Sequence, residues 1–154
     1  MAWLIAALQW AHILFAIAWF GGSVAVAFLV TPAAARLSPD DQAGWWGAFS
    51  QQSVRYFATM AGATILLGIV RGIAGGVFST LTSAYGLTWI ASLIVSIALA
   101  AWGANVTNKA VLRIAQSAAA DRPASVDRAV RFGRIELGGF LLVFTMMIAM
   151  RFGY

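Results

Sequence analysis

The chain has 154 residues, of which 62% are hydrophobic and only 10% are charged, and its mean hydropathy is +0.85. A soluble domain is about a quarter charged, so this composition leaves too little polar surface for a water-soluble globule and predicts a protein of the lipid bilayer. The length allows one transmembrane domain, residues 1–154. Cysteine is absent, which excludes disulfides, thiolate metal sites and iron–sulfur clusters.

Four apolar segments are long enough to cross a bilayer, whose core of about 30 Å needs roughly 20 helical residues. They lie at about residues 3–30, 56–77, 87–106 and 135–154. These segments predict an all-α fold, an integral membrane up-and-down four-helix bundle. The sequence Ser38-Pro39-Asp40-Asp41 is typical of a helix start, so the second helix is expected to begin near Pro39. Ser125 is expected to cap the helix that leads into the fourth segment.

The basic residues indicate how the bundle is oriented. Eight of the ten flank the first and third connections, namely Arg36, Arg55, Lys109, Arg113, Arg122, Arg128, Arg131 and Arg134. By the positive-inside rule, residues 31–55 and 107–134 face the cytoplasm and both termini lie outside a bacterial-type inner (plasma) membrane. The same partition explains the net charge of +5 without a nucleic-acid partner. The partners expected are lipid and either a second copy of the chain or a larger membrane complex.

His12 is the single histidine of the chain and lies well inside the first segment. About nine residues at 1.5 Å each place it roughly 14 Å from the outer end of that helix. Ionisable groups within membranes are costly and usually functional, and imidazole is a common ligand of haem iron and of copper. Thr64, Ser96 and residues 144–147 are expected at the same depth. The alternative is a neutral histidine that bonds one helix to another.

Two methionines and two arginines are placed to complete such a site. Met146 or Met147 would give a His/Met pair suited to haem or copper, although methionine also fills gaps between helices. Arg71 and Arg151 each lie about one turn from the outer boundary, where guanidinium groups would pair with haem propionates. The alternative for both arginines is that they extend to the lipid headgroups.

Further residues of the first segment belong to this hypothesis. Trp19 follows His12 by seven residues and therefore lies on the same helix face. Gly21 and Gly22 would let a flat cofactor or a neighbouring backbone come close, and a homodimer through them would bring two copies of His12 to one haem. A paired carboxylate within the membrane is not expected, because Glu136 and the four aspartates lie near or beyond the cytoplasmic interface.

The segment His12-Ile-Leu-Phe-Ala-Ile-Ala-Trp19-Phe-Gly21-Gly22, followed by Thr31-Pro32, resembles the opening helix of the CopD-like superfamily. This group of small membrane proteins includes copper-resistance D domains and HemJ-type protoporphyrinogen oxidases. Leu66-Leu67-Gly68 resembles the second helix of the group. The resemblance implies a four-span fold and haem binding at His12, or copper uptake. HemJ-type enzymes also carry a lysine in the third membrane helix, and residues 89–96 contain none.

The sequence thus predicts an integral membrane haem b protein of redox or porphyrin-handling type. His12 would be one axial ligand, and Met146, Met147 or the partner's His12 the other; an enzyme of this kind would be a membrane oxidoreductase. Two alternatives remain open, a copper-handling permease and a structural or accessory subunit without chemistry.

Overall fold

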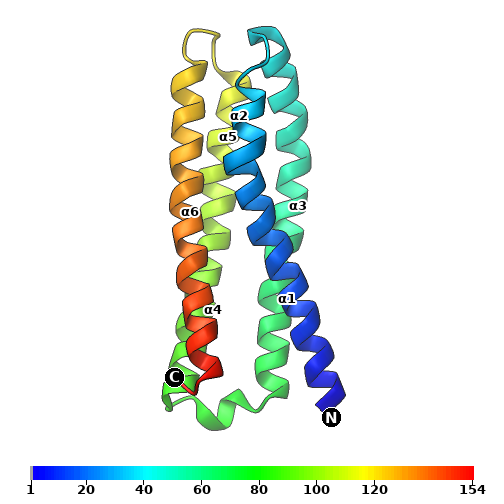
Figure 1. Cartoon of the computed structure of the whole chain (residues 1–154), viewed down its shortest axis with the longest axis vertical. Coiled ribbons are helices and arrows are strands. Elements are labelled where there is room, and N and C mark those ends of the chain that lie inside the picture. The colour runs from blue at the N-terminus through cyan, green and yellow to red at the C-terminus, as the bar shows by residue number, and fades with distance from the viewer. Residues whose placement is uncertain (1) are drawn as a thin grey trace.

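The computed structural model describes residues 2–154, which form helices and short turns without a strand (Figure 1). The helices build four rods. The first rod consists of α1 (Ala2–Ala25), the π-helical turn η1 (Val26–Val30) and α2 (Thr31–Ala34), and the second is α3 (Pro39–Ala74). The third consists of α4 (Ala84–Trp102), the π-helical turn η3 (Gly103–Thr107) and α5 (Asn108–Gln116), and the fourth is α6 (Arg122–Arg151). A 3₁₀ turn, η2 (Val77–Thr80), lies between α3 and α4.

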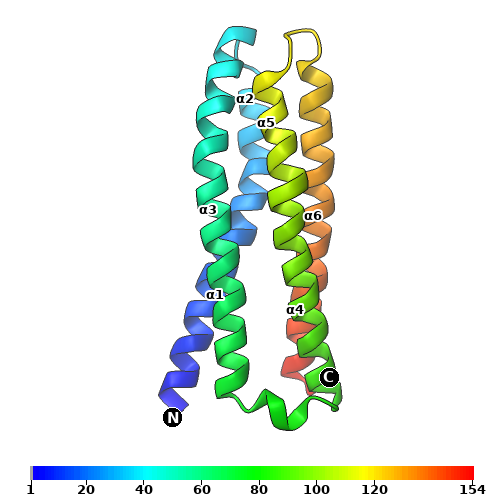
Figure 2. The same ribbon diagram turned by 180° about the vertical axis from the view of Figure 1, so that it is seen from behind.

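The four rods run up and down, and each connection is short (Figures 1 and 2). Both termini and the α3–α4 connection lie at one end, here called the terminal end, and the other two connections lie at the distal end. The closest pairs are α1 with α3 and α4 with α6. Each rod is long and apolar enough to cross a membrane. The predicted all-α four-helix bundle is therefore confirmed.

The helix starts follow local capping chemistry, with one correction to the sequence analysis. The Ser38 hydroxyl accepts the backbone N–H of Asp41 at 3.3 Å, and α3 begins at Pro39 as predicted. Ser125, expected to be a cap, instead lies inside α6, with its hydroxyl 2.7 Å from that of Ser117. The reason is Pro123, which fits the first turn of a helix because no partner is needed there for an N–H. Helix α6 therefore starts at Arg122, before the proline.

Two turns of the bundle are π-helical, with an N–H that bonds the carbonyl five residues earlier. Thr31 N–H bonds to Val26, and Asn108 N–H bonds to Gly103. Pro32 accounts for the first turn, because proline lacks an N–H and its ring collides with the carbonyl four residues before it. Each π turn accommodates one additional residue and locally widens the helix.

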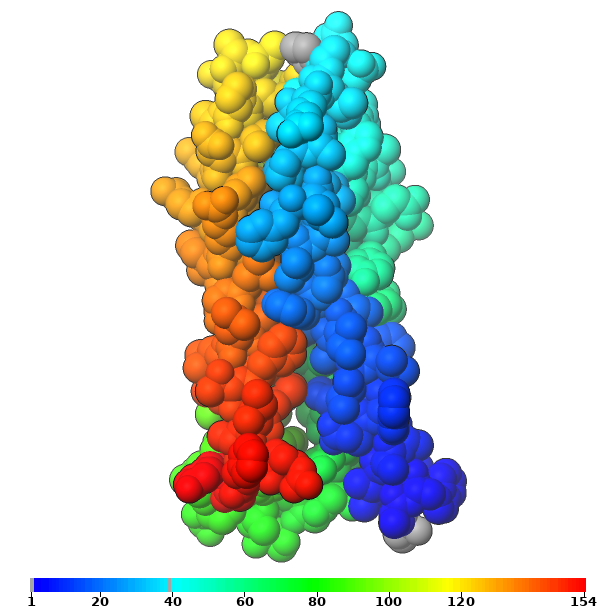
Figure 3. Space-filling view, viewed as in Figure 1, coloured from blue at the N-terminus to red at the C-terminus, as the bar shows by residue number. Residues whose placement is uncertain are grey.

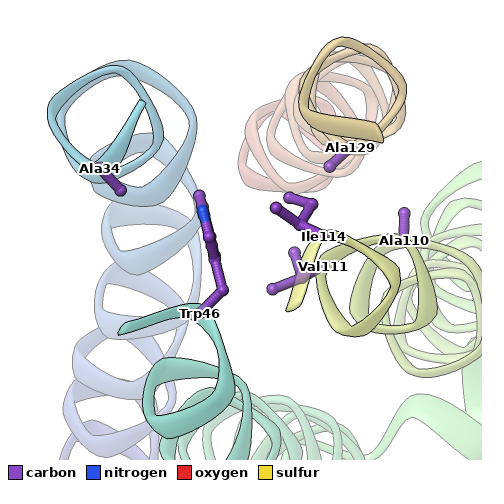
Figure 4. Packing of buried hydrophobic residues seen from close by; sticks show 6 residues of the cluster. All are labelled: Ala34, Trp46, Ala110, Val111, Ile114 and Ala129. Atoms are coloured by element: carbon purple, nitrogen blue, oxygen red, sulfur yellow. The ribbon is translucent and has the colours of Figure 1, made fainter. Parts of the chain in front are cut away.

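The buried apolar side chains form two separate clusters. The distal core surrounds Trp46 of α3 at the distal end and contains Ala34, Ala110, Val111, Ile114 and Ala129 (Figure 4). The central core contains Trp19, Ala61, Leu99, Phe140 and Val143. Within the central core, the rings of Trp19 and Phe140 meet edge to face with centroids 4.8 Å apart. Two cavities, described below, also lie in the interior of the bundle.

Candidate functional site

A cavity of about 610 Å³ lies between the four rods at the terminal end, and we call it the terminal cavity. Its volume falls in the range of about 300–1,000 Å³ that is usual for small-molecule and cofactor sites. Toward this end α1 diverges from α6, and a hollow between them is visible on the surface (Figures 1 and 3). The residues of the site come from all four rods and include Gln9, His12, Thr64, Gly68, Arg71, Tyr85, Trp89, Ser96, Met147, Met150 and Arg151.

His12 is buried, and its ring is held by a hydrogen bond to α3. The distance from Nδ1 of His12 to the backbone oxygen of Thr64 is 2.8 Å. A carbonyl oxygen can only accept, so Nδ1 must carry the hydrogen. In the neutral ring this leaves the lone pair on Nε2, which is the arrangement that orients histidine ligands in metal and haem sites. The same bond also joins α1 to α3, so it serves helix packing as well.

Two glycines of α3 give His12 and Trp89 room to approach. A methyl group on Gly68 would lie 3.0 Å from Cε1 of His12, and one on Gly72 would lie 2.6 Å from Nε1 of Trp89. Residues four apart share one helix face, so the two rings rest on a single strip of α3. Gly72 was not among the predicted site residues, although the spacing Gly68-x-x-x-Gly72 is a known signal of close helix approach.

The cationic side of the terminal cavity is formed by Arg71 and Arg151. Arg71 is half-buried, and its Nη1 donates to the hydroxyl of Tyr85 at 3.0 Å. Its Nε is buried, and no atom of the described residues accepts from it. Arg151 is exposed in the last turn of α6. The arrangement can therefore receive an anionic group, since at least one buried donor still lacks a partner.

The antiparallel depth estimate agrees with the structure. Thr64 and Ser96, expected at the level of His12, both line the terminal cavity with it. Of the two methionines considered as ligands, Met147 lines the cavity, and Met146 is not among the lining residues. Met150 also lines it, one turn beyond Met147 on the same face of α6. The groups able to hold a metal or cofactor iron here thus include the His12 imidazole and these two thioethers.

Three other residues singled out in the first segment lie away from the terminal cavity. Trp19 belongs to the central core. A methyl group on Gly22 would lie 2.8 Å from the ring of Tyr56, whose hydroxyl donates to the backbone oxygen of Ala18 at 2.8 Å. Gly21 is exposed, with open space beside it. Gly22 therefore supports the packing of α1 against α3, and only Gly21 presents a free surface to a second copy.

Glu136, which the sequence predicts near the cytoplasmic interface, has one of the most buried polar side chains, with 5% of its surface exposed. It lies far from the terminal cavity, in contact with η3. Its position at the start of an apolar segment gave no signal of burial, because a π turn in a neighbouring rod provides its surroundings.

Comparison of the chain with protein-family models, with curated proteins and with solved structures finds no match.

We expect the His12 ring to be a single tautomer with its hydrogen on Nδ1. The chain has one histidine, so nitrogen NMR of protein labelled with ¹⁵N-histidine reports this ring alone. Gly68→Val should displace the ring from Thr64 and replace the single Nδ1–H signature by a mixture of tautomers. Gly62→Val is the matched control, because a methyl group at Gly62 meets no atom within 4 Å. A wild-type ring protonated on Nε2 alone would contradict the assignment.

Proposed function

We propose that this chain is an integral membrane protein that binds haem b in the terminal cavity, with His12 as an axial ligand. One observation carries the proposal. The Nδ1 of His12 is committed to the Thr64 carbonyl at 2.8 Å, and the ring lines a cavity of about 610 Å³ that Arg71 and Arg151 also line. Such a protein would move electrons or handle porphyrins.

The membrane placement that we propose is a bacterial-type inner membrane. Large apolar side chains are exposed along the rods, for example Ile94 at 62%, Leu66 at 61% and Leu141 at 60%. In water these side chains would be unfavourable, whereas lipid solvates them. Exposed Arg128, Arg131 and other cations gather toward the distal end, which supports cytoplasmic residues 31–55 and 107–134 and an outward terminal end.

The residues around the terminal cavity fit haem in three respects. His12 offers an oriented imidazole, and Arg71 offers a buried Nε that lacks an acceptor. Guanidinium and carboxylate form strong, charge-assisted hydrogen bonds, so Arg71, with Arg151 at the rim, would hold the propionates. Trp89, which rests on Gly72, would supply an aromatic wall. When bound, haem supplies the one-electron chemistry, and the chain supplies ligation, charge balance and a low-polarity surrounding.

Met147 is the residue that we propose as second axial ligand, because it lines the terminal cavity from α6, the rod across the hollow from α1. A His/Met pair raises the reduction potential of haem iron relative to a pair of histidines. The partner's His12 is the other candidate, and it would require a dimer that closes the hollow between α1 and α6.

Copper is the second candidate, and the thioethers favour it. Met147 and Met150 line the same cavity as His12, and Cu(I) prefers soft sulfur ligands together with imidazole. This arrangement would suit a copper-handling permease. A structural or accessory role, in which His12 only joins α1 to α3, is the third possibility that the experiments below distinguish.

The topology can be tested with single cysteines, because the chain contains none. We expect Ser117→Cys, between α5 and α6, to react with a membrane-impermeant maleimide only after the inner membrane is opened. Ser79→Cys, in η2 at the terminal end, should react in intact spheroplasts. The reverse pattern would contradict the proposed orientation, and reaction of both in spheroplasts would contradict membrane insertion.

The haem assignment is tested by visible spectra of the detergent-purified protein, made in cells supplied with a haem precursor. We expect a Soret band and sharp α and β bands on reduction, and their loss in His12→Ala. Added imidazole should restore the bands in His12→Ala, because the truncation leaves space for it beside Thr64.

A colourless wild type would overturn the haem proposal. Elemental analysis of the same sample then distinguishes a copper-handling permease from an accessory subunit. About one copper per chain that His12→Ala loses would favour the permease, and the absence of both cofactors from a folded protein would favour an accessory role.

The second ligand can be identified by comparing neighbouring methionines. We expect Met147→Leu to retain haem but to convert it from low spin to high spin, with a lower reduction potential. Met146→Leu, one residue away and outside the cavity lining, should leave the spectrum unchanged. An unchanged spectrum in Met147→Leu would instead favour the partner's His12 and a dimeric protein.

A further inference from the structure

A second cavity, of about 490 Å³, lies between the central core and the distal core, and we call it the distal cavity. Both π turns of the bundle line it, η1 through Val26 and Ala27 and η3 through Gly103, Ala104 and Thr107. π turns are rare and frequently mark functional sites. Because both of them line the distal cavity, we infer that this cavity is built into the fold.

Glu136 of α6 lies in the wall of the distal cavity, with 5% of its surface exposed. The hydroxyl of Thr107 donates to its Oε2 at 2.7 Å. Its Oε1 lies against Gly103, where an added methyl group would be 3.3 Å away. The first and last residues of η3 therefore position the carboxylate, and the absence of a side chain at Gly103 leaves room for Oε1.

The described contacts of Glu136 hold one polar partner. That partner is the hydroxyl of Thr107. Arg131 and Arg134 of the same helix are exposed. Lys109 lines the cavity, but it is exposed, and its Nζ lies 3.4 Å from Oδ1 of Asn105. Burial of a carboxylate with one hydroxyl donor is costly unless a proton or a cation neutralises it, and the cavity beside Glu136 has room for a cation.

The rest of the lining is mainly apolar and aromatic, with Trp19, Phe49, Phe57 and Ala61 among its members, and its other oxygen-bearing side chains are Ser23, Thr31, Ser53 and Asn108. An inorganic cation would need several oxygen ligands close together, and Thr107 is the one described hydroxyl bonded to Glu136. A bulky organic cation would be matched by apolar walls and aromatic faces. Val54 and Leu112, also in the lining, are 40% and 37% exposed, so the cavity reaches the surface of the bundle.

We propose that the distal cavity binds a lipophilic organic monocation, of the quaternary ammonium or phosphonium class, with Glu136 as its counter-ion. The two cavities share one lining residue, Ile65, whereas Glu136 lines only the distal cavity and His12 only the terminal cavity. The two proposals therefore rest on different residues, and neither depends on the other.

The test is equilibrium binding of radiolabelled tetraphenylphosphonium to the full chain in a non-ionic detergent. We expect saturable binding at one cation per chain, weakened at least tenfold in Glu136→Gln. Glu136→Asp, which keeps the charge, should bind within a few-fold of wild type. Asp127→Asn, which removes an exposed carboxylate of the same helix outside the lining of both cavities, is the matched control and should bind like wild type.

Charge dependence can also be measured without a variant, in case Glu136→Gln does not fold. The neutral analogue triphenylphosphine oxide should fail to displace the labelled cation at concentrations where unlabelled tetraphenylphosphonium displaces it fully. The proposal is overturned by wild type without saturable binding, by Glu136→Gln that binds as tightly as wild type, or by equal displacement by the neutral analogue.

Discussion

The hydrogen bond between His12 and the Thr64 carbonyl is the interaction on which the terminal half of the bundle depends. An apolar helix pair offers few polar partners, so a buried imidazole must use the backbone of its neighbour. A helical carbonyl has a second lone pair. The Thr64 oxygen can therefore accept a hydrogen bond from His12 while it still accepts the hydrogen bond of its own helix, α3. This bond requires the two backbones to be close, and Gly68 provides that closeness. On the other side α1 diverges from α6, and the terminal cavity occupies the resulting space.

Many of the buried and half-buried polar side chains of the bundle fall into two groups. Hydroxyls generally bond to a carbonyl of the preceding turn of their own helix, as Ser92 does with Trp89, Thr64 with Met60 and Ser53 with Ser50. They are satisfied locally and need nothing from a ligand. His12, Arg71 and Glu136 instead bond to other segments, and each lines a cavity with capacity for one more partner. The groups that can still bind a ligand are thus those whose hydrogen bonds are not made within their own helix.

The sequence predicts the depth of a residue along its helix better than the direction in which its side chain points around the helix axis. Hydropathy located the four rods, and a rise of 1.5 Å per residue correctly brought His12, Thr64 and Ser96 to one level. Which of Met146 and Met147 lines the cavity depends on the rotation of α6, which packing decides. Trp19 shares the helix face of His12, yet seven residues place it about 10 Å away along the axis, in the central core. The burial of Glu136 depends on η3, which lies about thirty residues earlier in the chain. No proline marks this π turn in the sequence, whereas Pro32 marks the first one.

The π turn before Pro32 makes the length of the first rod a functional quantity as well as its composition. The π turn takes up one residue more than an α turn, and Pro32 opposes its return to ordinary α geometry. Removal of one residue between His12 and Ala25, where the rod is α-helical, would rotate everything on its N-terminal side by about 100° and shift it by about 1.5 Å relative to the distal half. His12 would then leave the strip formed by Gly68 and turn away from Thr64, although no residue of the site had changed. Among homologous chains, the number of residues between the histidine and the Thr-Pro pair should therefore vary less than their identities.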